Sequence, residues 1–407
     1  MKLLFLNSAY PEERLEVFKK EAKGTLQIPA NTFQWAVLDG LEKNGVDYTL
    51  FSVPALPAWP HYKHLFTPCG NMKVNGHIKG RYLRLCNLPA VKQLHERLVL
   101  QRFARQWCKD NQNEDKICIL TYTQQVEFLK AAINLKQRFP NIVVATIVTD
   151  LIENALDFAS NKRPLKRVQV AIETREEKKL FSKVDKYILL SRYMTEYIPE
   201  ADNRYIVIEG IAPKVSSVSY VVEKENEEKD IKTLLYTGAL EKYAGVDDLI
   251  DAFRLTNNPK YRLIVCGSGP SASYIKQASA EDGRIVFKGR LSRDEAVRLQ
   301  QTCTALINPR RPNGEITKYS FPSKTMEYMT SGTPMIGYHL EGIPDEYYEY
   351  MYTPVDLSVE SLSRCIDTVL SLPFDERHSM ADSASSFICD YKNPKVQVKK
   401  IIEFLND

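Results

Sequence analysis

Short apolar runs alternate with amphipathic segments of helical period along the sequence, and this alternation restricts the fold more than any other feature. The runs in the first half are expected strands: Leu3–Leu6, Tyr48–Val53, Ile117–Thr121, Val143–Val148, Tyr187–Leu190 and Tyr205–Ile208. A second series follows: Thr233–Tyr236, Arg262–Cys266, Ile285–Phe287, Ala305–Asn308 and Met335–Gly337. Strands that alternate with helices are typical of parallel α/β sheets. Since 407 residues are enough for two cores, the pattern predicts two Rossmann-like, doubly wound α/β domains.

The domain boundaries follow from changes in composition. The run Val222–Asp230 is highly charged and lacks a core pattern, which is typical of a surface loop or linker. We therefore predict an N-terminal domain over residues 1–209 and a C-terminal domain over residues 210–390. Residues 391–407 form a separate helix whose apolar face we expect to pack back on the N-terminal domain. That face consists of Val398, Ile401, Ile402 and Leu405.

Targeting and cysteine signals are weak. No run approaches the ~18 apolar residues of a membrane-spanning helix, and the apolar run Leu3–Leu6 is too short for a signal peptide. We therefore expect a cytoplasmic protein. The eight cysteines are scattered without a C-x-x-C pair, which predicts buried, reduced thiols and neither a zinc site nor a disulfide framework.

Positive charge is concentrated in one stretch of the first half. Between Lys73 and Lys109, nine Lys and Arg residues accompany a single acid, Glu96. Leucines and valines from Leu83 to Leu100 add a helix-like apolar face. The combination favours an anionic membrane surface as partner, with peripheral attachment at the inner face of the membrane, over nucleic acid. A simple solvated basic face remains an alternative.

The most informative stretch runs from Ala305 to Pro344. A predicted strand is followed by a loop that carries Arg310 and Lys318, and then by a helical run for which Ser323 is the predicted N-cap. The free amides and dipole of such a helix start attract phosphate, and Arg310, Lys318 and Lys324 could clamp it. Glu327, one turn in, could accept hydrogen bonds from a ribose diol. The alternative is a solvated helix start with an ordinary surface glutamate.

This stretch resembles the donor-binding signature of the family-four retaining glycosyltransferases of the GT-B fold. Residues Glu327–Ile336 fit the pattern E-x-M-x-S-G-x-P-x-I, and the preceding Pro-Ser-Lys resembles the bacterial polysaccharide branch of that family. Tyr236–Gly245 and Leu263–Pro270 resemble its two glycine loops. The resemblance implies a GT-B fold, with two Rossmann-like domains facing across a cleft. It also implies that the donor is contacted by eight residues: Gly238, Lys242, Gly267, Arg310, Lys318, Ser323, Lys324 and Glu327.

The sequence departs from that family at three positions. Tyr319 stands where the usual first glutamate would be, and Ala239 and Ala244 replace basic residues of the first loop. These departures leave open which cations hold the phosphates.

The resemblance also implies what the N-terminal domain does. It would bind the acceptor, a glycan or lipid-linked sugar in cell-surface polysaccharide assembly, and present Asp150 as the catalytic contact at the reaction centre. The alternative for Asp150 is a residue at a strand end that caps the following turn. Asn7 and Ser8 follow the first strand and should line the cleft on the acceptor side. The donor would be a UDP or GDP sugar, and the anomeric configuration would be retained. No D-x-D occurs in the sequence, so no metal or other cofactor is expected.

Two other classes of protein fit parts of the sequence. Gly267–Ala272 fits G-x-G-x-x-A, the fingerprint of nicotinamide-dependent oxidoreductases, but no acid follows about 20 residues on to bind the ribose. The second alternative is a non-catalytic sugar-nucleotide or membrane-binding protein that retains the fold. The departures at Tyr319, Ala239 and Ala244 favour it.

Overall fold

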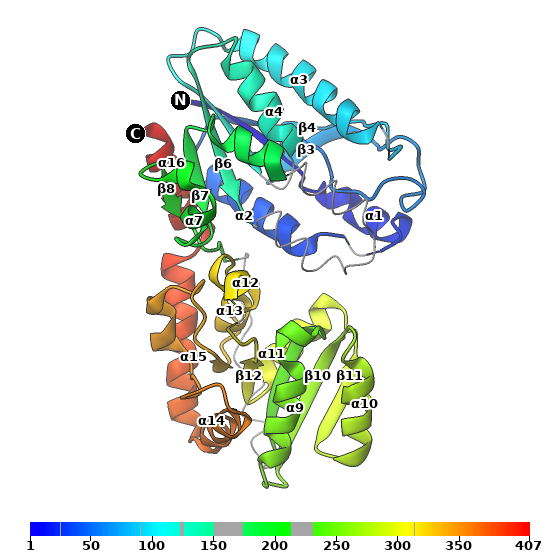
Figure 1. Cartoon of the computed structure of the whole chain (residues 1–407), viewed down its shortest axis with the longest axis vertical. Helices are drawn as coiled ribbons and strands as arrows, with labels where there is room; N and C mark the ends of the chain where they lie inside the picture. The colour runs from blue at the N-terminus through cyan, green and yellow to red at the C-terminus, as the bar shows by residue number, and fades with distance from the viewer. Residues whose placement is uncertain (25, 90, 123–125, 150–173, 213–230, 313) are drawn as a thin grey trace. The chain divides into compact units, whose positions relative to one another are not determined.

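The computed structural model describes residues 1–24, 26–89, 91–122, 126–149, 174–212, 231–312 and 314–407 (Figure 1). The chain divides into two compact units. Unit 1 comprises Met1–Pro213 together with Pro394–Asp407, and unit 2 comprises Lys214–Asn393. Each unit is built around its own sheet.

The sheet of unit 1 has the strand order β3-β4-β2-β1-β5-β6-β7-β8. Its strands are β1 (Lys2–Asn7), β2 (Tyr48–Ser52), β3 (Gly70–Val74), β4 (His77–Tyr82), β5 (Ile117–Tyr122), β6 (Ile142–Val148), β7 (Lys186–Leu189) and β8 (Tyr205–Val207). All neighbours pair in parallel except β3 and β4. The central strand β1 is apolar almost throughout, because helices cover both faces of a parallel sheet.

The helices of unit 1 lie on both faces of this sheet. Among the described residues they include α1 (Leu15–Glu21), α2 (Ile28–Lys43), α3 (Lys92–Asp110), α4 (Val126–Lys136), α7 (Met194–Tyr197) and α16 (Pro394–Asn406), with short 3-10 turns at Glu12–Arg14 and Pro199–Ala201. Residues 174–181 are also helical. Helices α3 and α4 lie side by side on one face, and α2 with α16 covers the other (Figure 1). On α16, Val398, Ile401 and Leu405 are buried in the same core cluster as Leu3 and Phe5.

The hairpin of β3 and β4 was not predicted. Its turn is Asn75-Gly76, and both residues have positive φ, 49° and 83°. The basic stretch 73–109 is therefore not one helix but a hairpin, a connecting segment and then α3. The expected helical face is also wrong at its start, because Leu83 and Leu85 precede α3 and are buried at 2% and 1% exposure.

Unit 2 has a five-stranded parallel sheet in the order β11-β10-β9-β12-β13. The strands are β9 (Lys232–Ala239), β10 (Tyr261–Ser268), β11 (Ile285–Gly289), β12 (Ala305–Asn308) and β13 (Met335–Gly337). The helices are α9 (Val246–Leu255), α10 (Ala272–Glu281), α11 (Arg293–Thr302), α12 (Gly314–Lys318), α13 (Ser323–Met329), α14 (Val359–Ser371) and α15 (Phe374–Tyr391), with 3-10 turns η3 (Lys242–Ala244) and η4 (Asp345–Tyr350). Every strand predicted in this half is present.

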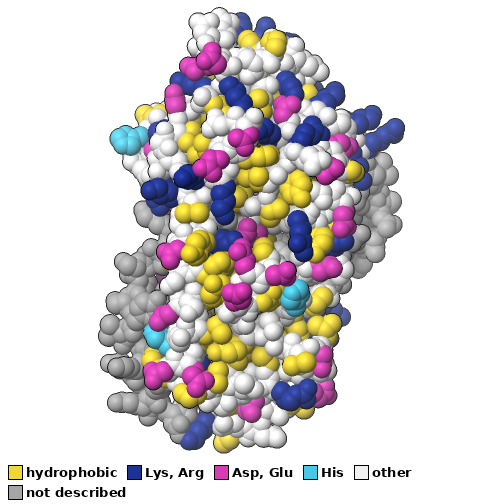
Figure 2. Space-filling view, turned by 90° about the vertical axis from the view of Figure 1, so that its left-hand side faces the viewer, with side chains coloured by type: hydrophobic (Ala, Val, Ile, Leu, Met, Phe, Trp, Pro, Cys, Tyr) yellow, Lys and Arg dark blue, Asp and Glu magenta, His cyan; other side chains and the backbone are white. Residues whose placement is uncertain are grey.

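On the face drawn in Figure 2, Lys and Arg side chains are mixed with Asp and Glu, and apolar side chains are scattered among them. The cysteines are free thiols; Cys118, Cys266 and Cys303 are buried as predicted. Cys69 and Cys389 are exposed, contrary to the expectation, because one lies before the edge strand β3 and the other on α15. Within the described ranges, no helix has the length and apolarity needed to cross a lipid bilayer.

Candidate functional site

Two glycine-rich turns meet at the carboxyl edge of the unit 2 sheet. A Cβ atom on Gly267, at the end of β10, would lie 1.8 Å from the carbonyl oxygen of Gly238, at the end of β9. A Cβ on Gly269 would lie 2.7 Å from the backbone of Leu240, whose amide donates to Ser268 at 3.1 Å. Only glycine allows this approach, so the two turns form a bare backbone surface where ligands of parallel α/β sheets bind.

Lys324, from the first turn of α13, reaches this backbone surface. Its Nζ would lie 1.9 Å from a Cβ on Gly238, so the ammonium group occupies the space that the glycine leaves. Nζ donates to the Tyr236 hydroxyl at 2.9 Å and lies 4.3 Å from the centre of that ring. Burial lowers the pKa of Lys324 to about 8, with Glu327 opposing the shift and Arg310 adding to it. The site thus holds a partly desolvated cation that a bound anion would stabilise.

Two further predicted cations come from the segment after β12. Arg310 donates from Nη2 to the Ser320 hydroxyl at 3.4 Å, and its guanidinium carbon lies 5.9 Å from the centre of the Tyr243 ring. Lys318 ends α12, with Nζ 5.7 Å from the centre of the Tyr319 ring. Arg310 lies close enough to Lys324 to lower the pKa of that lysine. Arg310 and Lys324 therefore act on the same space.

The first glycine loop, Tyr236–Gly245, contributes more to the shape of the site than to its charge. Gly245 has a φ of 73°, and a Cβ there would lie 2.0 Å from the carbonyl oxygen of Pro309, so the end of this loop packs on the exit of β12. Lys242, predicted as a donor contact, lies in η3 with an exposed side chain. Tyr319, at the position of the family's usual first glutamate, is only 9% exposed.

Glu327 is held by a hydrogen-bond network that the sequence did not reveal. The buried Gln300 of α11 donates from Nε2 to Glu327 Oε1 at 2.6 Å and to Thr237 Oγ1 at 3.0 Å. The backbone carbonyl of Gln300 in turn accepts from the Thr333 hydroxyl at 2.7 Å. A carboxylate oxygen has more than one acceptor position, so Glu327 keeps capacity for a ligand while Gln300 fixes its direction.

The predicted N-cap role of Ser323 is wrong. Pro322 is the N-cap residue of α13, Ser323 is the first helical residue, and no side chain caps this helix start. The backbone of Pro322, with φ −70° and ψ 110°, turns into the helix one residue earlier than expected. The orphan amides of the first turn consequently have no side-chain acceptor from the cap position.

The predicted residues of unit 1 are buried or outside the described ranges. Asn7 and Ser8 follow β1 at 0% and 6% exposure. Ser8 donates from its backbone amide to Gln34 Oε1 at 2.8 Å, and Asn7 Oδ1 accepts from the Ala9 amide at 3.1 Å. Asp150 lies outside the described residues, and so does the linker 222–230. The acceptor-side roles of these residues remain predictions.

Three residues of the site were missed as contacts. Tyr236 supports Lys324, Gln300 orients Glu327, and the buried Tyr328 accepts from the Thr237 amide at 3.0 Å. In the sequence, only the positions of these residues could have indicated a role. Tyr236 ends an apolar run before a glycine, and Gln300 falls on the apolar side of a charged helix. In the described part of the chain, no three His, Cys, Asp or Glu side chains are grouped so that they could hold a metal ion.

Two α/β sheets, parallel apart from the β3–β4 pair, and a bare glycine surface at one carboxyl edge are typical of the architecture of GT-B enzymes. The structure matches solved GT-B glycosyltransferases over its full length. Residues 221–387 match the family model described as Glycosyl transferases group 1. Unit 2 therefore matches a group 1 glycosyltransferase domain over most of its length. A search of curated proteins finds no sequence match.

Similar solved structures include three proteins of low identity. A sucrose-phosphate synthase from Thermosynechococcus elongatus is 16% identical, with a TM-score of 0.63, and 100% of this chain and 98% of that chain are covered. A lipopolysaccharide outer core galactosyltransferase in its apo form is 16% identical, with a TM-score of 0.60 and coverage of 100% and 99%. An Anabaena protein, HepE, in complex with UDP is 14% identical, with a TM-score of 0.58 and coverage of 100% and 100%. At this identity, the likeness shows the fold.

Proposed function

We propose that the protein transfers a sugar from a UDP or GDP sugar to a glycan or lipid-linked acceptor, with retention of anomeric configuration, in the assembly of a cell-surface polysaccharide. The observation that carries the proposal is Lys324, a partly desolvated cation against the Gly238 turn. Phosphate is the ligand that best suits a cation beside free backbone amides. UDP in the complex of the Anabaena relative favours a uridine nucleotide.

In this proposal each group of the site has one task. Gly238 and Gly267 leave room for the diphosphate, and Lys324, Arg310 and Lys318 neutralise the charge that grows on it as the sugar leaves. The first-turn amides at Ser323 add hydrogen bonds, Glu327 binds the ribose, and Lys242 closes over the donor from η3. Asp150, Asn7 and Ser8 serve the acceptor and the reaction centre.

The membrane is part of the same proposal. A lipid-linked acceptor requires the protein to work at a membrane face, and the basic stretch 73–109 suits an anionic surface. The location would be the cytoplasmic side of that membrane.

The proposal is tested by calorimetric titration with nucleoside diphosphates and nucleotide sugars without added metal. We expect one diphosphate to bind selectively, and Glu327→Ala to weaken it at least tenfold, since a charge-assisted hydrogen bond contributes about 1.5–3 kcal/mol. Glu341→Ala, an exposed loop glutamate of the same unit, is the matched control and should bind as the parent protein does. Equal binding by Glu327→Ala would remove Glu327 from the site.

A second function is favoured by Tyr319, Ala239 and Ala244, which replace charged residues of the family pattern. A non-catalytic sugar-nucleotide or membrane-binding protein would bind the nucleotide sugar without turnover. Release of the nucleoside diphosphate from the bound donor, with lipid-linked acceptors present, distinguishes the two: release with a glycosylated product supports the enzyme, and binding without release under any acceptor supports the alternative.

A further inference from the structure

A groove of about 460 Å³ lies on unit 1 between the C-terminal halves of α3 and α4. Its charged lining is Arg102, Arg105 and Lys109 from α3 and Arg138 just after α4. Both helix ends precede the starts of β5 and β6, so the groove lies at the amino edge of the sheet. Asn7 and Ser8 follow β1 at the opposite, carboxyl edge, and the groove is therefore separate from the proposed acceptor side.

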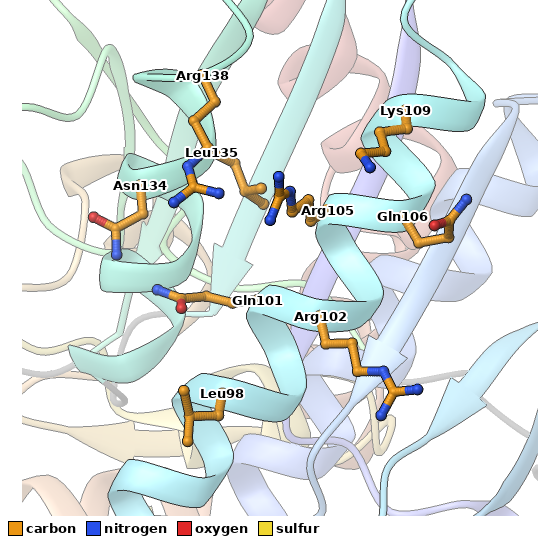
Figure 3. A pocket seen from close by; sticks show the side chains of 9 residues that line it. All are labelled: Leu98, Gln101, Arg102, Arg105, Gln106, Lys109, Asn134, Leu135 and Arg138. Atoms are coloured by element: carbon orange, nitrogen blue, oxygen red, sulfur yellow. The ribbon is translucent and has the colours of Figure 1, made fainter.

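Like charges face one another in this groove. Figure 3 shows Arg105 of α3 and Arg138 pointing toward each other across the gap, with Leu135 between them and Gln101 reaching from α3 toward α4. No ion pair joins Arg102, Arg105, Lys109 or Arg138 to a carboxylate of any described residue. Cations gathered without a counter-charge repel one another, and an anion in the groove would remove that repulsion.

The acids near α3 do not neutralise the groove. Glu96 is buried, 5% exposed, on the inward side of the helix. Asp110 accepts from Gln106 at 2.8 Å, and Glu127 of α4 lies with Lys130 at 3.2 Å. The face of Figure 2, where both signs are mixed, differs in this respect from the groove.

The outward stripe of α3 continues from the groove as an apolar surface. Val91, Leu94, Leu98, Arg102, Arg105 and Lys109 follow helical spacing along one face. Leu94 and Leu98 are 50% and 53% exposed, and Leu88 and Val91 before the helix are each 39% exposed. One face of α3 thus presents apolar side chains over its first half and cations over its second, which suits an amphiphile with an anionic head.

We propose that the groove between α3 and α4 binds the phosphate headgroup of an anionic lipid, while the apolar part of the α3 stripe meets the acyl-chain boundary. This inference rests on the proposed membrane contact of residues 73–109 and deepens it. It assigns the contact to particular side chains, excludes the hairpin residues Lys73 and Lys79 from the headgroup site, and adds Arg138 from outside that stretch. It does not involve the donor site.

The test is co-sedimentation of the full chain with phosphatidylcholine vesicles that contain or lack phosphatidylglycerol. We expect binding only to the anionic vesicles. Because each Lys or Arg near an anionic surface contributes about fivefold to partition, Arg105→Gln with Arg138→Gln should weaken binding about 30-fold. The matched control, Lys183→Gln with Lys276→Gln, removes two exposed charges elsewhere and should bind clearly better than the groove variant.

Two further measurements separate the sources of phosphate and the causes of failure. Leu94→Asn should weaken vesicle binding and leave titration with inorganic pyrophosphate unchanged, since pyrophosphate has no acyl chain. A contrary result would be a parent protein that binds pyrophosphate but not anionic vesicles, while Arg105→Gln with Arg138→Gln loses the pyrophosphate binding. That result would overturn the lipid as the occupant of the groove. Equal vesicle binding by the groove variant and the parent protein would overturn the site. Nucleoside diphosphate binding by the groove variant should be normal, so its loss would instead implicate the fold, and thermal unfolding checks this.

Discussion

At the scale of single residues, the candidate donor site depends on a lysine in an unusual place. Lys324 lies in the first turn of α13, where a cation opposes the helix dipole, and Tyr236 and Gly238 confine its ammonium group. Burial and the neighbouring Arg310 lower the pKa of Lys324, and a bound phosphate would reverse the effect. The residue is therefore expected to link ligand binding to proton uptake.

Binding of the nucleoside diphosphate should weaken as pH rises through about 8. The free protein holds the pKa of Lys324 near 8, whereas a phosphate nearby raises it, so the complex binds more protons than the free protein above that pH. Affinity is then full below about pH 8 and falls above it. Lys324→Met should bind at least tenfold more weakly at pH 7 and show a flat profile from pH 7 to about 9. Calorimetry in buffers of different ionisation enthalpy measures the proton uptake; a pH-dependent variant would assign the effect to another group.

Gly238→Ala should damage the site more than the fold. Its Cβ would meet the flexible end of Lys324, 1.9 Å away, and would displace the ammonium group from Tyr236. Gly283→Ala is the control, because nothing lies within 4 Å of its Cβ. We expect Gly238→Ala to bind the diphosphate at least tenfold more weakly and to lose only about 1 kcal/mol in the free energy of unfolding. Gly283→Ala should be close to the parent protein in affinity and in stability. Unchanged affinity would show that Lys324 does not need this space.

At single residues, the sequence indicates which side chains lie together where a motif fixes the backbone, and it does not where packing decides. Arg310, Lys324 and Glu327 follow from the helix start and the strand end, and the structure brings Arg310 and Glu327 within electrostatic reach of Lys324. Gln300 lies 27 positions before Glu327 on another helix, so only the fold brings the two together. The N-cap prediction for Ser323 is wrong by one residue, and assigned helix ends commonly differ by one or two residues.

At the scale of elements, every predicted strand is present, and the error is the hairpin of β3 and β4. The burial pattern of β4 is mostly exposed or intermediate, so the apolar alternation that marks a strand is absent. The turn Asn75-Gly76 was nevertheless visible in the sequence, since Asn-Gly is the strongest short signal of a hairpin. The packing of α16 on α2 could not be predicted in detail. It depends on Gly40 of α2, whose backbone conformation is ordinary, so the sequence does not indicate that a helix packs closely against it.

Gly40→Ala should destabilise unit 1. A Cβ on Gly40 of α2 would lie 2.3 Å from Val398 Cγ2 and 2.4 Å from the carbonyl oxygen of Pro394, so α16 would have to move away. Overpacking of this kind costs about 1–3 kcal/mol. Urea unfolding followed by a probe in unit 1 measures the loss, with Gly283→Ala in unit 2 as the control. Equal stability of the two variants would mean that the α2–α16 contact is loose in solution.

At the scale of the whole molecule, the two units have separate cores, and the proposed ligands divide between them. A ligand that binds only the native form of unit 2 stabilises that unit, by about 2.7 kcal/mol when its concentration is 100 times Kd. Hydrogen exchange should therefore slow in β9, β10 and α13 when the selected nucleoside diphosphate is added. The strands β1 and β5 of unit 1 should not change by a comparable amount. Protection confined to unit 1 would contradict the assignment of the donor site to unit 2.

The return of α16 to unit 1 has a consequence for how the chain is made. Part of the unit 1 core, at Val398, Ile401 and Leu405, lies after the last residue of unit 2. During synthesis, unit 2 can complete its core before unit 1 can, although domains usually mature in the order of the chain. Until residue 405 is available, unit 1 keeps an uncovered apolar strip along α2. A nascent chain of this protein should therefore need protection at its first unit for longer than at its second.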